Sequence, residues 1–465
     1  MRYDLVIIGG GPGGYVPAIR SAQYGLRTAL VEMGELGGTC LNRGCVPTKA
    51  LLHAAGLINQ TLDFQSFGIT ADNVSIDLKK IYEKKDETVA GMREGIARLL
   101  KSNGVDILRG RAFLPKQGIV EVKLEDKTQT LRAENVLIAT GSAAKKPPIL
   151  GIDSPGVVFS DDLLLSPLDF ESLIIIGAGA VGVEFALALA AFGIKVTLLE
   201  SMERILPAMD KEISQNLSMI MKKRGVQVVS GVLVKEIVKS NNALRCVYEK
   251  NGAEQSVPAE RVFAAVGRSP MFDGLFDKSL GIKTGRGIVV DENFETSVKG
   301  IYAAGDVLEN SRQLAHAASA EGVCAVMHIA KKPFCTDLFT VPSCIYTDPE
   351  IAAVGMTADE AKQSGIAART GKCLMGGNAR SVIEGAGRGF IKLVFNNADD
   401  KLIGAHIMCP GATDIIGFLS AAITMGLTSK KLASFVFAHP TFMEGVAEAA
   451  DNSNGQAIHA VPRKV

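Results

Sequence analysis

The segment GGTCLNRGCVPTK (37–49) contains two cysteines, Cys40 and Cys45, separated by four residues and flanked by glycines. Three kinds of site would use such a pair: a structural disulfide, a metal site or a redox-active disulfide. A structural disulfide that closes so short a loop stabilises a fold by only about 2 kcal/mol. Structural zinc normally has four ligands, whereas the sequence has no second close cysteine pair and His53 is the only nearby histidine.

A redox-active pair is the interpretation that this spacing favours, although the other two remain open. On a regular helix, residues five positions apart lie too far from each other for an unstrained disulfide. A bond between Cys40 and Cys45 would therefore be strained and easily reduced, as suits a catalytic disulfide beside a redox cofactor. The other six cysteines are scattered, and we interpret them as small core residues: Cys246, Cys324, Cys335, Cys344, Cys373 and Cys409.

A candidate acid–base pair lies in AHPTFMEG (438–445). His439 precedes Pro440, which favours an extended backbone. An imidazole titrates near neutral pH, as a base that removes a thiol proton should, although His439 could also be an ordinary loop histidine. Thr441 and Glu444 have the T-x-x-E spacing of a helix capping box. Glu444 is therefore expected either to cap this helix or to orient His439, because one side chain is not expected to reach both partners.

Helices and strands must position these residues, and an internal repeat in the sequence predicts the first of these elements. Residues 3–32 (YDLVIIGGGPGGYVPAIRSAQYGLRTALVE) align without insertion with residues 171–200 (ESLIIIGAGAVGVEFALALAAFGIKVTLLE). Each copy predicts a buried strand, a glycine turn, a helix and a second strand that ends in a glutamate. The corresponding residues are Gly9, Gly11, Gly14 and Glu32 in the first copy, and Gly177, Gly179, Gly182 and Glu200 in the second.

Each copy matches the dinucleotide-binding fingerprint in the required context, between a strand and a helix. The glycines allow a tight turn and a close approach of pyrophosphate to the helix N-terminus. Glu32 and Glu200 would accept hydrogen bonds from ribose, so two dinucleotides are expected. Because the Glu200 carboxylate would repel a 2′-phosphate, NAD is favoured over NADP at the second site, although Arg204 lies nearby. Pro17 predicts a local kink or a tightened first turn in the first helix.

Further strand ends divide the rest of the chain. NVLIATGS (135–142) ends a strand at Thr140–Gly141 and runs into a proline-rich linker, and RVFAAVGRSP (261–270) ends another at Gly267. Asp306 follows a third strand, where it could contact a cofactor hydroxyl or cap a turn. We predict an α/β fold with two Rossmann-like dinucleotide-binding domains and a C-terminal α+β domain. The predicted divisions are 1–144 and 145–266 for the two dinucleotide domains, 267–335 for a central segment completing the first site, and 336–465 for an interface domain.

The composition fits a globular protein of several domains. The chain has 465 residues, about three times the length of a typical domain. Apolar residues make up 47% and charged residues 21%, and the net charge of +1 gives no indication of a nucleic acid or an anionic membrane as partner. No apolar run is long enough to span a bilayer, and a strand is predicted almost from the first residue. A cytoplasmic location is expected, although a processed organellar enzyme could look the same.

The cysteine segment, the doubled fingerprint, the ATG and YAAGD strand ends and AHPTFMEG resemble the flavoprotein disulfide reductase family over the whole chain. The resemblance implies FAD on the first fingerprint, NAD on the second, and a homodimer in which the C-terminal domain completes the partner's active site. It is strongest for members that reoxidise dihydrolipoamide in 2-oxo acid dehydrogenase or glycine cleavage complexes. The partners would then be lipoyl domains and the acyltransferase core of such a complex, or a lipoylated H protein.

The same resemblance implies roles for individual residues. Cys40 would exchange with the substrate, and Cys45 would face the flavin as a thiolate. Lys49 and Glu184 would lie beside the flavin's reactive nitrogen, and Asp306 would hold its ribityl chain. The helix after Asp306 would point its positive end at the flavin. Further cofactor-binding residues would be Thr39, Thr140, Gly141, Gly267 and Ala315, and no metal is expected.

His439 would be the base by this resemblance, and Glu444 the residue that orients it. Two departures from the family lie beside them: Phe437 stands where a second histidine or a tyrosine–proline pair is often found, and Met443 where a smaller polar residue is common. Two alternatives remain. A related reductase that uses NADPH would have basic residues around Glu200, and a catalytically silent structural subunit would have lost at least one redox residue.

Overall fold

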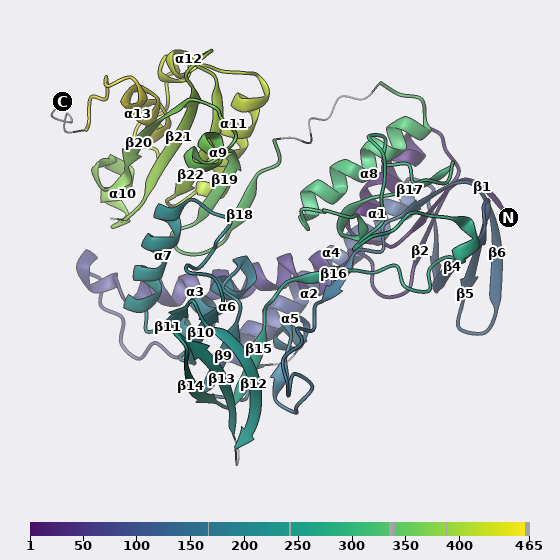
Figure 1. Ribbon diagram of the computed structural model, residues 1–465, viewed down its shortest axis with the longest axis horizontal. Helices are drawn as coiled ribbons and strands as arrows, with labels where there is room; N and C mark the ends of the chain where they lie inside the picture. Colours follow the sequence, from purple (N-terminus) through teal and green to yellow (C-terminus); the bar gives the residue numbers. More distant parts are fainter. Residues whose placement is uncertain (166, 241–242, 334–337, 339, 387, 461–465) are drawn as a thin grey trace.

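The structure is a computed structural model, and it describes residues 1–165, 167–240, 243–333, 338, 340–386 and 388–460 (Figure 1). Cys335 and the predicted division between 335 and 336 lie outside these residues. The predicted α/β class is confirmed, because two sheets built on parallel strands are followed by an antiparallel sheet with helices. Within the part of the chain that the structure describes, no helix is long and apolar enough to cross a membrane.

The first unit is a seven-stranded sheet with the strand order β3-β2-β1-β6-β5-β4, and β17 pairs with β6. Its strands β1, β2, β3, β6 and β17 pair in parallel. The strands are β1 (Arg2–Ile8), β2 (Thr28–Glu32), β3 (Asp106–Arg109), β4 (Arg111–Lys116), β5 (Ile119–Lys123), β6 (Thr128–Ile138) and β17 (Ile301–Ala303). The helices are α1 (Pro12–Gln23), α2 (Gly38–Arg43), α3 (Cys45–Thr61), α4 (Leu78–Ser102) and α8 (Ala315–Ile329), with short 3-10 turns at Phe64–Phe67, Lys278–Leu280 and Gly305–Val307. β17 thus returns the chain to the first sheet, as a central segment completing this unit would; the exact domain divisions remain predictions.

The second unit is a parallel sheet in the order β11-β10-β9-β15-β8, with an antiparallel sheet β12-β13-β14 beside it. The parallel strands are β8 (Val157–Val158), β9 (Ser172–Ile176), β10 (Lys195–Glu200), β11 (Gln227–Ser230) and β15 (Arg261–Ala264), and the antiparallel ones are β12 (Leu233–Ser240), β13 (Ala243–Lys250) and β14 (Ala253–Ala259). The helices are α5 (Ser160–Leu165), α6 (Ala180–Ala191) and α7 (Lys211–Lys223). Two short antiparallel strands, β7 (Ser142–Ala144) and β16 (Arg268–Pro270), join the two units where the chain passes between them.

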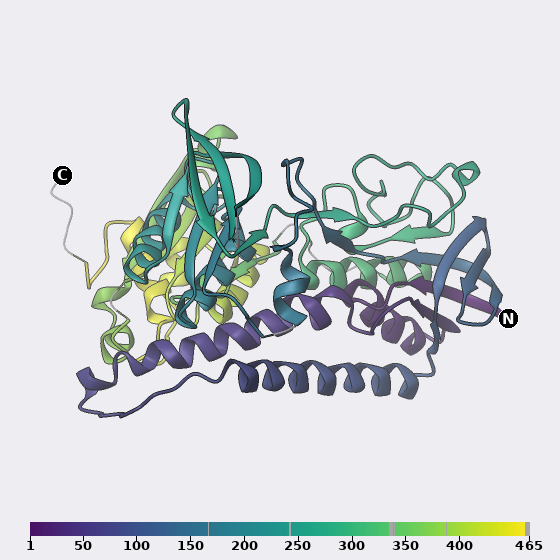
Figure 2. The ribbon, with the colours of Figure 1, turned by 90° about the horizontal axis from the view of Figure 1, so that it is seen from below.

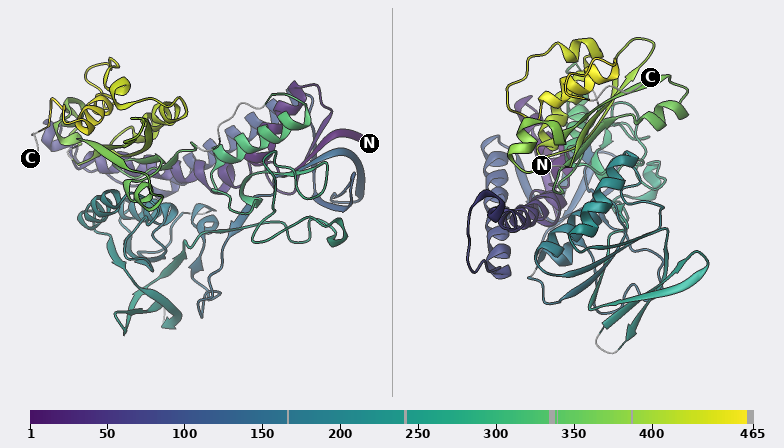
Figure 3. Two further views of the ribbon diagram at one scale, coloured as in Figure 1. Left: turned by 45° about the horizontal axis from the view of Figure 1, so that its top comes forward. Right: turned by 90° about the vertical axis from the view of Figure 1, so that its left-hand side faces the viewer.

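The C-terminal unit is an antiparallel sheet in the order β18-β19-β22-β21-β20. Its strands are β18 (Ser343–Ile345), β19 (Ile351–Gly355), β20 (Ala368–Leu374), β21 (Phe390–Asn396) and β22 (Leu402–Met408). Its helices are α9 (Ala358–Gln363), α10 (Ala379–Ile383), α11 (Ala412–Thr424), α12 (Ser429–Ala433) and α13 (Glu444–Ser453), with a 3-10 turn at Met375–Gly377. Figure 3 shows this unit on the opposite side of α3 from the antiparallel strands of the second unit.

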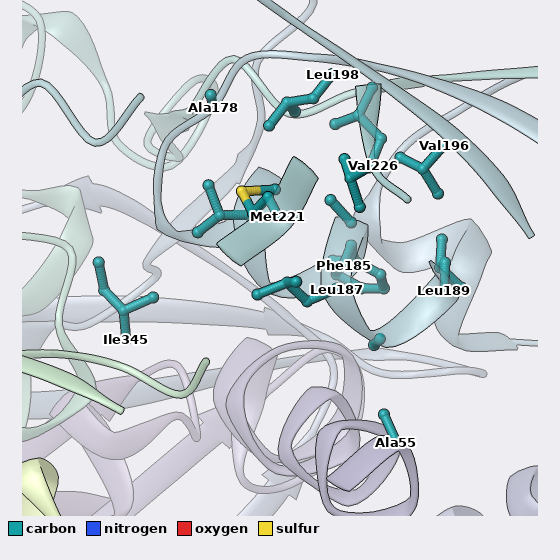
Figure 4. Packing of buried hydrophobic residues seen from close by; sticks show 14 of the residues in the cluster. Ala55, Ala178, Phe185, Leu187, Leu189, Val196, Leu198, Met221, Val226 and Ile345 are labelled. Carbon is teal, nitrogen blue, oxygen red and sulfur yellow. The ribbon is translucent and has the colours of Figure 1, made fainter. Parts of the chain in front are cut away.

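One hydrophobic cluster connects all three units. It joins Ala55 on α3, Phe185 on α6 and Ile345 on β18, and Figure 4 shows these side chains around the helices of the second unit. Figure 2 shows α3 running beneath the second and C-terminal units toward one end of the molecule. Because α3 begins at Cys45, the cysteine segment is anchored in a core that all three units share.

Glycines in the two fingerprints bring each turn against the neighbouring strand. A Cβ at Gly9 would lie 2.2 Å from the carbonyl oxygen of Ala139, and one at Gly177 would lie 2.5 Å from that of Ala265. Both residues have a positive φ, 107° and 104°. At Gly179, by contrast, an added Cβ would meet nothing within 4 Å, which leaves open space beside the helix N-terminus.

Helix α1 continues through Pro17 without a break. Its first turn is tightened, since the N–H of Gly14 donates to the carbonyl oxygen of Gly11, three residues back, at 2.8 Å. Pro17 is buried and packs against α8, where a Cβ at Gly322 would lie 2.8 Å from both the Gly13 oxygen and Pro17 Cγ. Gly13 is the residue whose carbonyl a non-proline at position 17 would bind, so α8 covers the site of the missing hydrogen bond.

Candidate active site

The cysteine segment is held against the first fingerprint by two glycines. Gly37 and Gly38 have φ values of 93° and 58°, and a Cβ at Gly38 would lie 2.6 Å from the Cα of Gly11. Helix α2, which carries Cys40, therefore starts in direct contact with the fingerprint turn. Gly44 separates α2 from α3, and Cys45 is the first residue of α3. The two thiols thus lie at a helix break rather than on one continuous helix.

The surroundings of the two thiols give them different acidities. Both are free thiols, Cys40 half-buried and Cys45 exposed. The hydrogen bond from Cys40, together with the Lys49 ammonium, lowers the pKa of Cys45 to about 7. The same hydrogen bond, with burial, raises the pKa of Cys40. Cys45 is therefore the thiol of the pair that loses its proton first as the pH rises. Among the described residues, no group of three or more His, Cys, Asp or Glu side chains could hold a metal ion, so the zinc interpretation gains no support.

The remaining cysteines fit the expectation of small core residues in part. Cys246, Cys324 and Cys409 are buried, whereas Cys344 and Cys373 are half-buried.

Lys49 and Glu184 form an ion pair between the first two units. Lys49 Nζ lies 2.9 Å and 3.1 Å from the two carboxylate oxygens of Glu184, which is buried. The backbone N–H of Tyr346, from the C-terminal unit, donates to the same carboxylate at 2.9 Å, and Lys49 Nζ lies 4.6 Å from the Tyr346 ring centre. Since Lys49 stands one helical turn after Cys45, three units together fix a cation beside the thiol pair.

Asp306 is bound into a network that sequence reasoning missed. Ser142 Oγ donates to Asp306 Oδ2 at 2.7 Å, and Arg268 Nε donates to Ser142 Oγ at 2.8 Å. Arg268 also donates to the Ser142 carbonyl at 2.7 Å and reaches Thr39 Oγ1 at 3.5 Å. Arg268 therefore links the residue before Cys40 to the Asp306 turn. The only sequence signal was its position directly after Gly267, and the partners come from three separate segments.

The other predicted residues near the first fingerprint also gather where the linking strands meet. The N–H of Met271 donates to the Gly141 carbonyl at 2.9 Å, and Thr140 Oγ1 donates to the Met271 carbonyl at 2.5 Å. Gly267 has a φ of 101° and its carbonyl accepts from Lys145 at 3.0 Å. Ala315 is the first residue of α8, and its role in binding the cofactor stays a prediction.

Glu32 and Glu200 occupy equivalent positions in the two repeats. Glu32 accepts from the N–H groups of Gly10 at 2.5 Å and Gly34 at 2.6 Å. Glu200 accepts from those of Ala178 at 2.6 Å and Met202 at 2.8 Å. A cavity of about 350 Å³ opens beside Glu32. Its lining includes Gly9, Glu32, Thr140, Met271, Phe272 and Leu275. The position of Glu32 in this cavity suits recognition of a ribose.

Arg204 lies near Glu200 in the sequence and therefore weakened the preference for NAD over NADP. In the structure it binds groups of its own loop and of α7. Its guanidinium donates to the carbonyls of Met209 at 2.9 Å and Pro207 at 2.8 Å, and to Ser214 Oγ at 3.2 Å. Because this guanidinium is used to fix its own loop, it is not free to bind the 2′-phosphate of NADP. The preference for NAD is therefore no longer weakened by Arg204.

The expectation that Glu444 serves only one partner is wrong. Its Oε1 lies 2.8 Å from Nδ1 of His439, and its Oε2 accepts from the N–H of Thr441 at 2.9 Å. The two oxygens of one carboxylate divide these roles. The capping box is only half formed, because Thr441 Oγ1 donates to the Ala438 carbonyl and α13 begins at Glu444 itself. Although partial burial raises the pKa of Glu444, the Thr441 N–H and His439 together hold that pKa below its usual value.

The His439 side chain is 70% exposed, and the C-terminal unit that carries it lies apart from α2 in Figure 1. Phe437, one of the two departures, packs edge-to-face on Phe418 with ring centres 5.9 Å apart. It is part of an aromatic cluster inside the C-terminal unit and therefore serves packing.

Residues 3–322 match the family model described as pyridine nucleotide-disulphide oxidoreductase, and residues 341–450 match the model of its dimerisation domain. The chain is 37% identical to a dihydrolipoyl dehydrogenase of Bacillus subtilis, over 98% of this chain and 99% of that protein. It is 38% identical to a dihydrolipoyl dehydrogenase of Geobacillus stearothermophilus, over 99% and 98%.

Two solved structures have a similar fold. LpdA from Mycobacterium tuberculosis has a TM-score of 0.89 and 26% identity, over 97% of this chain and 99% of that chain. The Cu(II) complex of the HOCl-induced flavoprotein disulfide reductase RclA from Escherichia coli has a TM-score of 0.86 and 28% identity, over the same shares.

Proposed function

This chain belongs to the pyridine nucleotide-disulphide oxidoreductase family, and from that premise we propose that it oxidises protein-bound dihydrolipoyl groups and reduces NAD⁺. The chain is an oxidoreductase with a dimerisation domain, and it uses FAD and NAD(H). The observation that carries the proposal is the Cys40–Cys45 pair, whose second thiol is acidic and stands beside the Lys49–Glu184 pair.

The residues present fit both dinucleotides. The open space at Gly179 lets a ligand approach the backbone N–H groups at the N-terminus of α6, and the cavity beside Glu32 reaches the first fingerprint at Gly9. Glu32, Thr140 and Asp306 would hold FAD, and Glu200 with the second fingerprint would hold NAD. When bound, FAD accepts an electron pair from thiols and passes it as hydride to NAD⁺.

The chain's own groups perform the thiol chemistry. The partner subunit's His439, oriented by a carboxylate, takes the proton of one substrate thiol. The resulting thiolate attacks Cys40 of the oxidised pair, so that a mixed disulfide forms and Cys45 leaves as a thiolate. The second substrate sulfur then displaces Cys40, which releases the oxidised lipoyl group and leaves both cysteines reduced. Lys49 stabilises the negative charge on Cys45.

The proposal extends to partners and location. Lipoyl domains and the acyltransferase core of a 2-oxo acid dehydrogenase complex, or a lipoylated H protein, would present the substrate, and the enzyme would act in the cytoplasm. The names of the curated relatives support the substrate, and the contacts of Arg204 support NAD as the acceptor.

An anaerobic titration with dihydrolipoamide, followed by NAD⁺, tests this function. The visible absorption of the purified holoenzyme should gain a long-wavelength band after two electrons and recover when NAD⁺ is added. The Cys45→Ser variant should lose lipoamide turnover while keeping its flavin. Reduction by NADPH together with no response to dihydrolipoamide would assign the chain to another reductase of the family, and near-normal turnover of Cys45→Ser would refute the mechanism.

A further inference from the structure

Four charged side chains join the second unit to the C-terminal unit. Asp210 and Glu212 lie at the N-terminus of α7, and Lys372 and Lys392 are directly paired across β20 and β21. Lys392 Nζ lies 2.8 Å and 3.0 Å from the two oxygens of Asp210 and 2.6 Å from Glu212. Lys372 Nζ lies 2.7 Å from the other oxygen of Glu212. We call these residues the four-charge cluster.

The centre of the four-charge cluster is buried. The side chains of Lys392 and Asp210 are 12% and 8% exposed. Burial by itself raises the pKa of Glu212. The hydrogen bonds from Lys372 and Lys392 nevertheless hold this pKa below its usual value. In such a setting each charge depends on its partners, because the loss of one leaves another without compensation away from water.

The loop 201–210 and its hydrogen bonds connect the four-charge cluster to the second fingerprint. Asp210 accepts from the N–H of Glu212 at 2.9 Å and so caps α7. The loop that precedes Asp210 is fixed by Arg204, as described above, and by Leu206, whose N–H donates to the Ala178 carbonyl at 2.9 Å. The N–H of Ala178 in turn donates to Glu200. Ala178, inside the fingerprint, is thus held from one side by Glu200 and from the other by a loop that ends at Asp210.

We propose that Lys392 is a positioning residue for the second dinucleotide site: from the C-terminal unit it fixes Asp210, and through the loop 201–210 it sets the place of Ala178 and Glu200. This inference rests on the proposed role of the second fingerprint as the NAD site. Lys392 touches neither ligand nor reacting atoms. Its loss should therefore change dinucleotide binding while leaving the thiol reaction at Cys40 and Cys45 intact.

The test is NADH binding to the holoenzyme by calorimetry in the Lys392→Met variant. Networks of this kind couple distant sites strongly enough that the loss of Lys392 should weaken NADH binding by about threefold to about thirtyfold. Flavin content and the rate of flavin reduction by dihydrolipoamide should be unchanged, and amide hydrogen exchange in the loop 201–210 should accelerate. Lys392→Arg, which keeps the charge, should restore binding. Asp210→Asn keeps a helix cap and removes the charge, and serves as a second variant if Lys392→Met does not fold.

Lys211→Met is the matched control. Lys211 is also on α7 and pairs with Asp359 of the C-terminal unit at 3.2 Å, but the two side chains are 67% and 63% exposed. Its loss should leave NADH affinity unchanged. Unchanged NADH affinity in folded Lys392→Met and Asp210→Asn, or an equal loss in Lys211→Met, overturns the inference. A wild-type enzyme that binds no NADH refutes the proposed function instead.

Discussion

At Cys45 the charge on a single sulfur is set by three neighbours. Cys40 donates a hydrogen bond to it, Lys49 adds a positive charge, and Glu184 opposes ionisation while holding Lys49 in place. The thiol that the family resemblance assigns to the flavin is therefore also the one that its surroundings make acidic. The roles assigned to the two cysteines stay a prediction, which a pH titration of the Cys45 thiol can test.

A pKa of about 7 predicts that the reduced pair changes charge near neutral pH. A lowered pKa favours the thiolate, so in the two-electron-reduced holoenzyme the long-wavelength absorption should grow as pH rises through about 7. Lys49→Met removes the stabilising cation and should move the midpoint upward. Absorption spectra recorded across pH check this. A midpoint near the ordinary thiol value of about 8.5 in the unchanged enzyme would contradict it.

The Glu444 side chain binds both His439 and the backbone N–H of Thr441. Glu444→Gln should keep an oxygen for the Thr441 N–H but lose the negative charge beside His439. Dihydrolipoamide oxidation should fall, by less than the roughly 10²–10⁴-fold expected when the base itself is removed in His439→Gln. Reduction of the flavin by NADH should be unaffected in both. Full dihydrolipoamide activity in Glu444→Gln would exclude Glu444 from orienting the base.

At the scale of elements, the junction between α2 and α3 positions the cysteines. The left-handed glycines at 37 and 38 let α2 approach the first fingerprint, and Gly44 ends α2 so that Cys45 can begin α3. A regular helix would have kept the two thiols apart. The break between the two helices instead lets the two thiols meet in a hydrogen bond.

Gly38→Ala tests this junction. Alanine at this position combines an unfavourable positive φ with a Cβ 2.6 Å from the Cα of Gly11, so we expect a loss of about 1–3 kcal/mol in the free energy of unfolding. Flavin retention should fall with it. Gly91→Ala on α4 is the matched control, because its Cβ meets nothing within 4 Å and alanine favours a helix by about 0.5–1 kcal/mol. Urea denaturation of both variants gives the comparison; equal stabilities would refute this role for Gly38.

At the scale of the whole molecule, three units share one core while the acid–base pair faces outward. The cluster that includes Ala55, Phe185 and Ile345 and the four-charge cluster hold the units together. His439, by contrast, lies in an exposed loop of the dimerisation domain, close to Val436, which is 99% exposed. In the proposed dimer, in which His439 completes the partner's active site, Val436 would lie beneath the second subunit.

Val436→Asp should therefore weaken the dimer, because a buried charge without a partner is costly at an interface. Sedimentation should show a larger monomer fraction, and dihydrolipoamide oxidation should fall with dilution as the shared site is lost. Met425→Asp changes another exposed apolar residue of the same domain and allows comparison of the two surfaces. A Val436→Asp variant that stays fully dimeric would place this residue outside the interface.

The sequence by itself determined the features that depend on neighbours along the chain. The repeat at 3–32 and 171–200 predicted two strand–turn–helix–strand units with Glu32 and Glu200 at equivalent strand ends, and Pro17 predicted the tightened turn. Such patterns are local, because turn geometry and periodicity are set within a few residues.

Only the tertiary structure decided which distant groups meet. It joined Arg268, Ser142 and Asp306 from separate segments, bound Arg204 to the carbonyls of its own loop, divided Glu444 between two partners, and placed Lys392 against Asp210. Each of these depends on the direction of a flexible side chain and on the packing of residues far apart in the chain. Packing of that kind leaves no regular period or spacing in the sequence, so composition and pattern do not reveal it.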